Sequence, residues 1–379
     1  MTIFILFFYI HTNMTVADKF FQARFITKKQ TINAYEHTFK KYCNFHSTSL
    51  DELLEEAEKD EMSSLPVKYR SIKQRLQSFQ VYLSKNYKYN TVKVEMSRIK
   101  TFYRTNEIEL PYLPPLKSVP TINTTFEEII TKDDIKYAFE HTNNKKLKAL
   151  ILFMCSSGTA INEATKITIQ QFIEATQDYH NATNIAEVIQ VLKKQDDVIP
   201  TFFMIREKKE RPYYTFCSPE AVRYILIYLE DRLFKKGINN NELLFPYTVP
   251  GAIATLIRLN DDCNFPRKKN GYRKFHSHGF RKFYATNMQE AGMNKFDIDF
   301  LCGRKSDMVT EAYFQIRPNS RKQRYKRYLK AVIVFDEVHY LDISSQEKKH
   351  YEKLKEEINK NKKENEQIKQ MLYDLQKLL

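Results

Sequence analysis

The sequence of 379 residues is poor in several residue types that mark particular classes of protein. It has no tryptophan, 7 glycines and 12 prolines, which is too little glycine and proline for a low-complexity or fibrous chain. It contains no glycine-rich phosphate loop and no acidic cluster of the kind that holds catalytic metals. These absences disfavour ATPases and two-metal nucleases, and we expect neither a metal nor a cofactor.

The five cysteines show neither C-x-x-C spacing nor an obvious pairing pattern. This usage favours a reducing cytoplasm and argues against structural zinc or disulfides. The cysteines are Cys43, Cys155, Cys217, Cys263 and Cys302.

Residues 1–18 are interpreted as an apolar N-terminal extension. The opening ten residues are apolar, but they fall short of the roughly 20 needed to span a bilayer. They also lack the positive leading segment of a signal peptide. Because Met14 precedes the first polar, helix-compatible residues, the opening 13 residues are interpreted as an upstream mis-start, and no membrane function is expected.

The charge balance is strongly positive. With 61 Lys and Arg against 46 Asp and Glu, the formal net charge is +15 and the isoelectric point is near 9.3. Such an excess predicts a salt-sensitive attraction to a polyanion. The alternative is that lysine and tyrosine are enriched because the genome is AT-rich, and the 24 tyrosines and 27 phenylalanines are compatible with that reading.

Residues 19–106 have a helical pattern. Ser49 and Glu52 have the spacing of a capping box, and two amphipathic stretches follow, Tyr69 to Leu83 and Thr91 to Tyr103. The second stretch has an approximate apolar stripe made of Val92, Val94, Met96, Ile99 and Phe102. Its basic residues, Lys93, Arg98 and Lys100, remain available to contact solvent or phosphate. By itself this pattern specifies a small helical bundle.

Residues 107–124 contain four prolines, a density that stops helices and predicts an extended linker between domains. Residues 125–340 are predicted to form a second domain that is mainly α with a small antiparallel sheet. In this domain Thr131 and Asp134 start a helix, another helix ends near Gly158, and Ser218 caps a third. Residues 200–206 and 211–217 are predicted to be two strands joined by a polar turn.

Residues 341–379 are predicted to form a coiled-coil helix. From Glu347 onward, mostly apolar residues recur at intervals of three and four, over about four heptads. The seam consists of Tyr351, Leu354, Ile358, Asn361, Asn365, Ile368, Leu372, Leu375 and Leu379. A coiled coil would join copies of the chain; the alternative is a single amphipathic helix folded onto its own domain.

The most informative segment runs from His276 to Phe314. His278 and Arg281 are spaced i, i+3, so on a helix they share one face and reach the same ligand. Gly303 and Arg304 follow, and Tyr313 lies nine residues after Arg304. Arginine offers a fork of donors to phosphate, histidine donates one hydrogen bond or moves a proton, and tyrosine serves as a nucleophile. Together these residues indicate covalent attack on a DNA phosphate.

These motifs, "HSHGFRKFYATNMQEAG", "LCGRKS" and "TEAYFQI", resemble those of the tyrosine recombinase (phage-type integrase) family, in particular archaeal integrases. The resemblance covers about Thr131 to Tyr328 and implies that residues 125–340 are the catalytic domain. It makes Arg281 the second family arginine and Tyr313 the nucleophile that forms a 3′-phosphotyrosine. His278 would orient a group or exchange a proton. Residues 19–106 would be the core-binding domain that closes over the duplex.

The resemblance also implies a lysine in a β-hairpin, which protonates the leaving 5′ oxygen when the DNA strand breaks. The polar turn 207–210 between the two predicted strands contains two lysines. Lys208 is the first choice for this general acid and Lys209 is the second. A charged hairpin tip that is merely solvated is the alternative.

Two positions depart from the family pattern. Ala160 stands where the family has its first arginine, between Gly158 and Glu163, and Arg304 replaces the histidine that usually follows Gly303. Loss of one donor that stabilises developing charge slows a reaction by roughly 10²–10³-fold. We therefore expect impaired cleavage. Arg304 could substitute in part if its guanidinium turned toward the phosphate.

The sequence favours a DNA integrase or site-specific recombinase of a mobile genetic element. Its expected partners are double-stranded DNA and further copies of the chain, with the coiled coil as a possible contact, in the cytoplasm on the nucleoid. Arg273, Lys274 and Lys282 are further candidates for contacts with DNA. The alternatives are a catalytically inactive DNA-binding relative, which Ala160 favours, a type IB topoisomerase and a coiled-coil scaffold.

Overall fold

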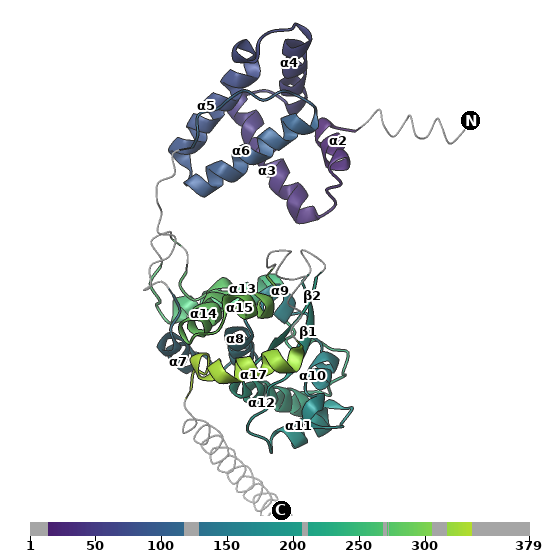
Figure 1. Cartoon of the computed structure of the whole chain (residues 1–379), viewed down its shortest axis with the longest axis vertical. Coiled ribbons are helices and arrows are strands. Elements are labelled where there is room, and N and C mark those ends of the chain that lie inside the picture. Colours follow the sequence, from purple (N-terminus) through teal and green to yellow (C-terminus); the bar gives the residue numbers. More distant parts are fainter. Residues whose placement is uncertain are drawn as a thin grey trace, which may run out of the picture. The chain divides into compact units, whose positions relative to one another are not determined.

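The computed structural model describes residues 14–116, 129–206, 211–267, 271, 273–304 and 317–335. The chain divides into two compact units, residues 1–122 and residues 123–379, and each has its own core (Figure 1). Helices dominate both units, and a two-stranded antiparallel sheet belongs to unit 2. The predicted fold class, mainly α with a small antiparallel sheet, is confirmed.

Unit 1 is a helical bundle. Its helices are α2 (Val16–Ala23), α3 (Lys29–His46), α4 (Leu50–Met62), α5 (Ser71–Asn86) and α6 (Tyr89–Thr105), with a short 3₁₀ turn, η1 (Val67–Tyr69). The predicted capping box is confirmed, because the Ser49 side chain accepts from the Glu52 amide and the Glu52 carboxylate accepts from the Ser49 amide. Apolar faces of all five helices meet in one core that includes Phe20, Phe39, Phe79 and Phe102.

Helix α6 differs from its predicted pattern at two positions. Val94, expected in the apolar stripe, is exposed, whereas Glu95 is buried. The burial of Glu95 is compensated by Lys41 of α3, whose Nζ lies 2.9 Å from Glu95 Oε1. A strict helical period places residue 95, and not residue 94, on the face shared with Val92 and Met96.

Unit 1 also extends beyond residue 106. Ile108 and Leu113 are buried in its core, and Gln80 donates to the Pro114 carbonyl at 2.9 Å. The apolar residues between the prolines hold this part of the predicted linker against the bundle, so 107–116 is not a free connector. Residues 117–124, the remainder of that prediction, lie outside the described residues.

Unit 2 contains more elements. Its helices are α7 (Lys132–Glu140), α8 (Lys145–Ser157), α9 (Ile161–Ala164), α10 (Ile169–Ala175), α11 (Ile185–Leu192), α12 (Pro219–Lys235), α13 (Val249–Asp262), α14 (Ser277–Glu290), α15 (Lys295–Leu301) and α17 (Pro318–Tyr328). Two 3₁₀ turns, η3 (Gln177–Tyr179) and η4 (Leu329–Ala331), complete the helical part. The strands are β1 (Thr201–Arg206) and β2 (Arg211–Phe216).

Helix α8 is the centre of unit 2. It is buried from Ala149 to Ser157 and packs against α12 and α14 (Figure 1). An almost wholly apolar helix of this kind is stable only when other elements cover all its sides. The predicted cap residues around it are confirmed: Thr131 begins α7 with a capping box, and Ser218 caps α12 with Pro219 in its first turn.

The two strands form a hairpin in which Thr201 pairs with Phe216 and Arg206 pairs with Arg211. Phe202 and Met204 of β1 face the core, whereas Phe203 and Ile205 are exposed. This alternation is the period of two expected for a strand with one covered face. The predicted strand positions are therefore confirmed; the turn 207–210 lies outside the described residues.

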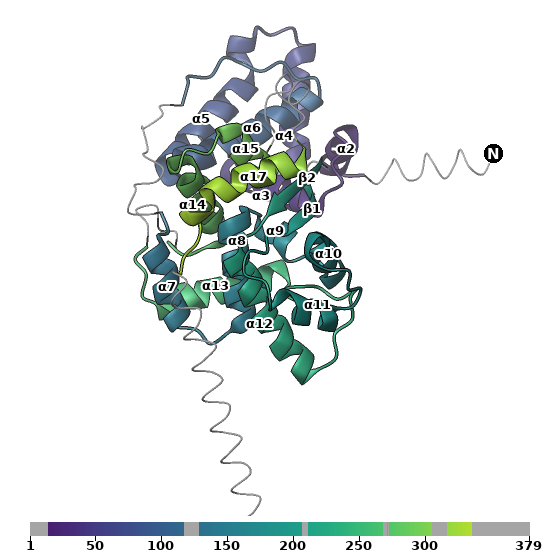
Figure 2. The ribbon, with the colours of Figure 1, turned by 60° about the horizontal axis from the view of Figure 1, so that its bottom comes forward.

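Helix α17 packs against β2 in unit 2 (Figure 2). Arg321 is fully buried: its Nε donates to Asp297 at 2.8 Å, and its Nη1 donates to the Tyr214 hydroxyl at 2.6 Å. The Tyr325 hydroxyl donates to the Ser156 carbonyl of α8 at 2.9 Å. The chain that follows the Tyr313 segment is thus held firmly to unit 2.

Residues 341–379, with the predicted heptads, lie outside the described part of the chain. Among the residues that the structure describes, no helix is long and apolar enough to cross a membrane.

Replacing Arg321 by alanine should loosen α17, because the Asp297 carboxylate stays buried with one partner fewer. Breaking a buried ion pair on one side costs about 3–5 kcal/mol, and Arg324, which also pairs with Asp297, reduces this loss. We expect faster hydrogen–deuterium exchange of the α17 amides and a lower denaturation midpoint. Arg327→Ala, at an exposed position of the same helix, is the control. Equal exchange in the two variants would contradict the anchoring role of Arg321.

Candidate functional site

Arg281 projects from α14 into the interior of unit 2. Its Nη1 donates to the Gly158 carbonyl at 3.1 Å, and its Nη2 donates to the Cys302 carbonyl. Burial, together with the nearby charges of Arg206 and Arg304, lowers the pKa of Arg281. Both acceptors are neutral carbonyl groups, so these bonds fix the guanidinium without neutralising its charge.

Two glycines make this arrangement possible. Gly158 ends α8 with a φ of +66°, and Gly303 follows α15 with a φ of +62°, a region that other residues enter at a steric cost. A Cβ at Gly158 would lie 2.5 Å from Tyr284 Cδ1, and one at Gly303 would lie 3.0 Å from the Tyr213 ring. Both turns therefore bring backbone carbonyls close to Arg281.

A second guanidinium reaches the same carbonyl oxygen. Arg206, the last residue of β1, donates from Nη1 to the Cys302 carbonyl at 3.3 Å. The same Nη1 lies 3.8 Å from Glu163 Oε1. Arg211, opposite Arg206 in the hairpin, donates to the Arg304 carbonyl at 3.2 Å. We call Arg206, Arg211, Arg281 and Arg304 the arginine cluster; it surrounds the turn formed by residues 302–304.

The Arg304 side chain is directed to another partner. Its Nη1 lies 3.0 Å from Asp299 Oδ1, and 41% of the side chain is exposed. An exposed pair of this kind contributes about 0–1 kcal/mol, so it holds the side chain weakly. In this structure Arg304 is paired with a residue of the preceding helix, α15.

His278 lies one turn before Arg281 on α14. Burial lowers its pKa, and the charges of Lys282, His276, Arg281 and Arg304 lower it further. A lowered pKa keeps the imidazole neutral near pH 7, where it is able to accept a proton.

Ala160 is the residue immediately before α9 and provides no side-chain cap for that helix. Three residues later, Glu163 is buried, and its Oε2 has no hydrogen-bond partner among the described residues. A methyl group thus occupies the family's first-arginine position, beside a buried carboxylate that pairs with Arg206 of β1.

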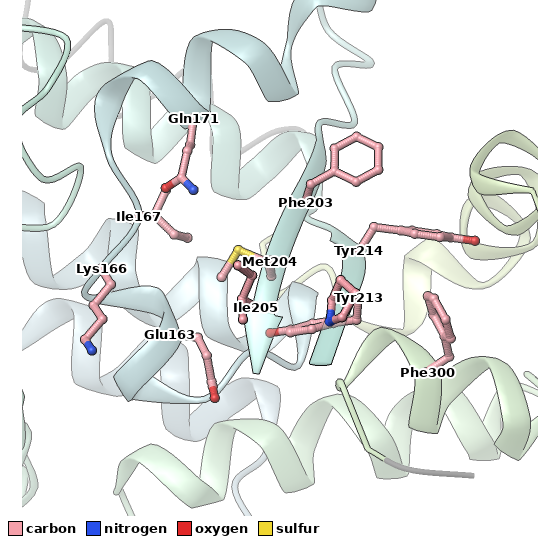
Figure 3. Close-up of a pocket in the computed structure, with 11 residues that line it drawn as sticks. Glu163, Lys166, Ile167, Gln171, Phe203, Met204, Ile205, Tyr213, Tyr214 and Phe300 are labelled. Carbon is pink, nitrogen blue, oxygen red and sulfur yellow. The ribbon is translucent and has the colours of Figure 1, made fainter. Parts of the chain in front are cut away.

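A pocket of about 590 Å³ adjoins the cluster. Figure 3 shows Glu163, Lys166, Ile167 and Gln171 on one side of the strands, with Tyr214 and Phe300 on the other. Phe203, Met204, Ile205, Pro212 and Tyr213 complete the lining. The lining is mainly apolar, and Glu163 links it to the arginine cluster.

The remaining candidates for catalysis lie outside the described residues. Tyr313 belongs to the segment 305–316, and Lys208 and Lys209 belong to the hairpin turn 207–210. Arg304 and Arg317, the described residues on either side of segment 305–316, both belong to unit 2. Of the predicted catalytic residues, the structure brings together His278, Arg281 and Arg304.

The predicted DNA contacts fall into two groups. Lys93 is exposed on α6, whereas Arg98 bonds the Thr38 hydroxyl at 3.1 Å and Lys100 is half-buried, with its pKa lowered by burial and by Arg104. These residues belong to unit 1.

In unit 2, Lys282 is partly exposed next to Arg281. Arg273 forms a two-pronged pair with Asp261, at 2.8 and 2.7 Å, and Lys274 pairs with Asp134 at 2.8 Å. The last two residues thus connect parts of their own domain, and their role in DNA binding stays a prediction.

Sequence reasoning missed Arg206 as a site residue. A signal was present: Phe202 and Met204 precede it at intervals of two on the covered face of β1, so residue 206 continues that series. An arginine at the inward-facing end of an apolar strand indicates a buried anionic or carbonyl partner.

The fold and the site define a mainly helical protein with a cationic centre built around a buried arginine and a neutral histidine, consistent with a protein that acts on phosphodiesters. The sequence model of the Phage integrase family matches residues 128–320, half of the chain. The chain belongs to the phage integrase family, so the predicted recognition and the general function, a tyrosine recombinase or integrase, are confirmed.

A probable integrase/recombinase of Acholeplasma phage L2 is 25% identical over 252 residues, which cover 62% of this chain and 71% of the relative. Among solved structures, the Tn1549 transposon integrase in complex with circular intermediate DNA has a TM-score of 0.48 at 16% identity, covering 83% of this chain and 99% of that one. A lambda integrase tetramer bound to a Holliday junction has a TM-score of 0.46 at 11% identity, covering 81% and 80%. With TM-scores below 0.5, these two similarities do not bear on the assignment.

The lowered pKa of His278 predicts a pH effect on stability. The unfolded chain takes up a proton near the usual pKa of 6.5, whereas the folded site resists protonation. His278 therefore makes the folded state lose stability as the pH falls through 6.5 toward the lower folded pKa. We expect His278→Gln to lose less stability than the unmodified protein between about pH 7 and pH 5 in denaturant titrations. His141→Gln, at an exposed site after α7, is the control; a pH dependence unaltered in His278→Gln would refute the assignment.

Proposed function

We propose that this protein is a DNA integrase or site-specific recombinase that cuts and rejoins DNA strands through a 3′-phosphotyrosine at Tyr313. The observation that carries the proposal is the buried guanidinium of Arg281, held by neutral carbonyls next to His278 and a second guanidinium. A phosphodiester undergoing attack gains negative charge, which a preorganised cationic site stabilises. Membership in the phage integrase family supports the same reaction.

Each residue has a defined part in this reaction. The Tyr313 oxygen forms a bond to phosphorus as the bond from phosphorus to the 5′ oxygen breaks, and Arg281 binds the non-bridging oxygens. His278, neutral at pH 7, accepts the tyrosine proton, and Lys208 or Lys209 protonates the leaving 5′ oxygen. Ligation is the reverse reaction, so no other energy source is required.

Ala160 favours a second candidate function, a recombinase-like DNA-binding protein without catalytic activity. It removes a donor whose loss slows comparable reactions by roughly 10²–10³-fold. A type IB topoisomerase would share the tyrosine chemistry, but it would relax supercoils without a specific site. These alternatives differ in whether an adduct forms and whether it requires a particular DNA sequence.

The two units have separate parts in binding. Unit 1 is proposed to be the core-binding domain and unit 2 the catalytic domain, each contacting double-stranded DNA through its basic side chains. We further propose that copies of the chain assemble on DNA, with residues 341–379 as a coiled-coil contact.

The test begins with DNA that the protein itself selects from a random-sequence duplex library. A nick close to the cleavage position in the selected site traps the covalent intermediate. The short fragment that carries the free 5′ hydroxyl diffuses away, so religation cannot occur. We expect a covalent protein–DNA adduct on a denaturing gel from the unmodified protein and none from Tyr313→Phe. Tyr112→Phe, which alters an exposed tyrosine of unit 1, should leave the adduct intact. DNA binding without any adduct, including from Ala160→Arg, would instead establish the inactive relative.

Replacing Lys93 by alanine should weaken DNA binding and reduce its salt dependence. Each phosphate contact contributes about 0.9 to the slope of log K against log salt, so loss of one contact should reduce that slope by about that amount. The slope is measured by fluorescence anisotropy over a series of salt concentrations. Lys59→Ala, at another exposed lysine of unit 1, should leave the slope unchanged; equal slopes for both variants would remove Lys93 from the interface.

A further inference from the structure

We propose that Arg206 supplies the phosphate-binding guanidinium that Ala160 does not, so that the second cation of the clamp comes from strand β1 and not from the start of α9. This inference rests on the proposed recombinase function and names a further residue for that reaction. It replaces the sequence-based suggestion that Arg304 compensates for Ala160.

The strand directs Arg206 into the site. Phe202 and Met204 occupy the covered face of β1, and Arg206 is the next residue on that face. About a quarter of its side chain is exposed, in contrast to Arg281, which is buried. Arg206 is therefore fixed by the fold while part of its side chain remains exposed.

Two contacts place Arg206 beside the expected position of the phosphate. Its Nη1 donates to the Cys302 carbonyl at 3.3 Å, the same oxygen that accepts from Arg281. Its Nη1 also lies 3.8 Å from Glu163, the acidic residue three positions after Ala160. The guanidinium of Arg206 thus lies between the family's acidic residue and its second arginine, where the first arginine would be needed.

The electrostatics of the cluster favour an anionic ligand. Four arginines gather at the 302–304 turn, where Glu163 pairs with Arg206 and Asp299 pairs with Arg304. Arg206 and Arg211 stand directly opposite each other, an arrangement that is destabilising for like charges. Binding of a phosphate relieves this repulsion.

Arg304 and Arg211 are weaker candidates for the same role. The Arg304 guanidinium pairs with Asp299 at 3.0 Å, which is shorter than the 3.8 Å between Arg206 and Glu163. The Arg211 guanidinium bonds the Arg304 carbonyl, whereas Arg206 bonds the Cys302 carbonyl that also accepts from Arg281.

In the reaction Arg206 neither gives nor accepts a proton. As the Tyr313 oxygen bonds to phosphorus and the bond to the 5′ oxygen breaks, the non-bridging oxygens gain negative charge. Arg206 and Arg281 donate hydrogen bonds to these oxygens from two directions, and they do so more strongly in the transition state than in the ground state. Loss of Arg206 should therefore reduce the cleavage rate more than the affinity for DNA.

The experiment measures the rate of adduct formation on the nicked selected duplex, with DNA affinity measured separately. We expect Arg206→Ala to form adduct roughly 10²–10³-fold more slowly than the unmodified protein. Arg206→Lys, which keeps a charge but loses the planar fork, should be intermediate. Arg223→Ala, a similarly exposed arginine of α12 paired with Asp196, should match the unmodified protein. Arg211→Ala, which also removes a bond between the β1–β2 hairpin and the 302–304 turn, tests whether loss of such a bond alone explains a slower rate of adduct formation.

Two readouts separate phosphate binding from a structural role. Introducing Ala160→Arg into Arg206→Ala should restore at least about tenfold of the rate, because the arginine returns at the family's position. A neutral methylphosphonate in place of the scissile phosphate should also reduce the difference between Arg206→Ala and the unmodified protein, because less charge then needs stabilising. Neither change repairs a misplaced hairpin.

The outcomes are distinct. The inference is supported if Arg206→Ala is slow, if Ala160→Arg restores its rate and if the methylphosphonate reduces its difference from the unmodified protein. It is overturned if Arg206→Ala forms adduct as fast as Arg223→Ala. It is also overturned if Arg211→Ala forms adduct as slowly as Arg206→Ala and neither Ala160→Arg nor the methylphosphonate reduces the defect of Arg206→Ala. Adduct from Ala160→Arg but none from the unmodified chain would refute both the role of Arg206 and the proposed activity of the unmodified protein, and would show an intact but disarmed site. No adduct from any variant would refute both.

Discussion

The hydrogen bonds that Arg281 donates to the carbonyls of Gly158 and Cys302 are the contacts on which the site depends. They connect the end of α8 with the face of α14 and the turn after α15, although residues 158 and 281 are 123 positions apart in the sequence. Both turns bring their carbonyls close only because glycine permits the positive φ angles. A buried arginine without acceptors would be strongly unfavourable, so the packing of unit 2 and the position of this charge are determined together.

The choice of acceptors decides what the site is able to bind. A carboxylate partner would satisfy Arg281 and also neutralise it, whereas a carbonyl satisfies its donors and leaves the charge in place. Arg206 and Arg211 also donate to carbonyls of the 302–304 turn, and Arg206 additionally pairs with the Glu163 carboxylate at 3.8 Å. The turn thus gathers positive charge that the protein itself only partly compensates, and such a preorganised centre suits an oxyanion that becomes more negative during reaction.

Local signals in the sequence were sufficient to predict much of the fold. The capping residues Ser49 and Thr131 and the strand alternation before Arg206 depend on nearest neighbours, and the structure agrees with them. The prediction that Val94 is buried was wrong, because the apolar pattern of the sequence does not reveal that Glu95 pairs with Lys41 of another helix. For the site, spacing along α14 was enough to pair His278 with Arg281. The hydrogen bond from Arg206 to the Cys302 carbonyl joins residues that are 96 positions apart, and a single sequence does not reveal such a contact.

Moving the second cation of the clamp from α9 to β1 would change how the site is controlled. Arg206 precedes Lys208, the proposed general acid, by two residues, so one hairpin would supply both charge stabilisation and the proton for the leaving group. A cation at the start of α9 would be held by a helix that also packs against α8 and α13. With Arg206 in that role, any displacement of the hairpin removes two contributions at once, and cleavage would become steeply dependent on how the strands β1 and β2 are held. The contacts from Arg206 and Arg211 to the 302–304 turn give the fold a means of holding them.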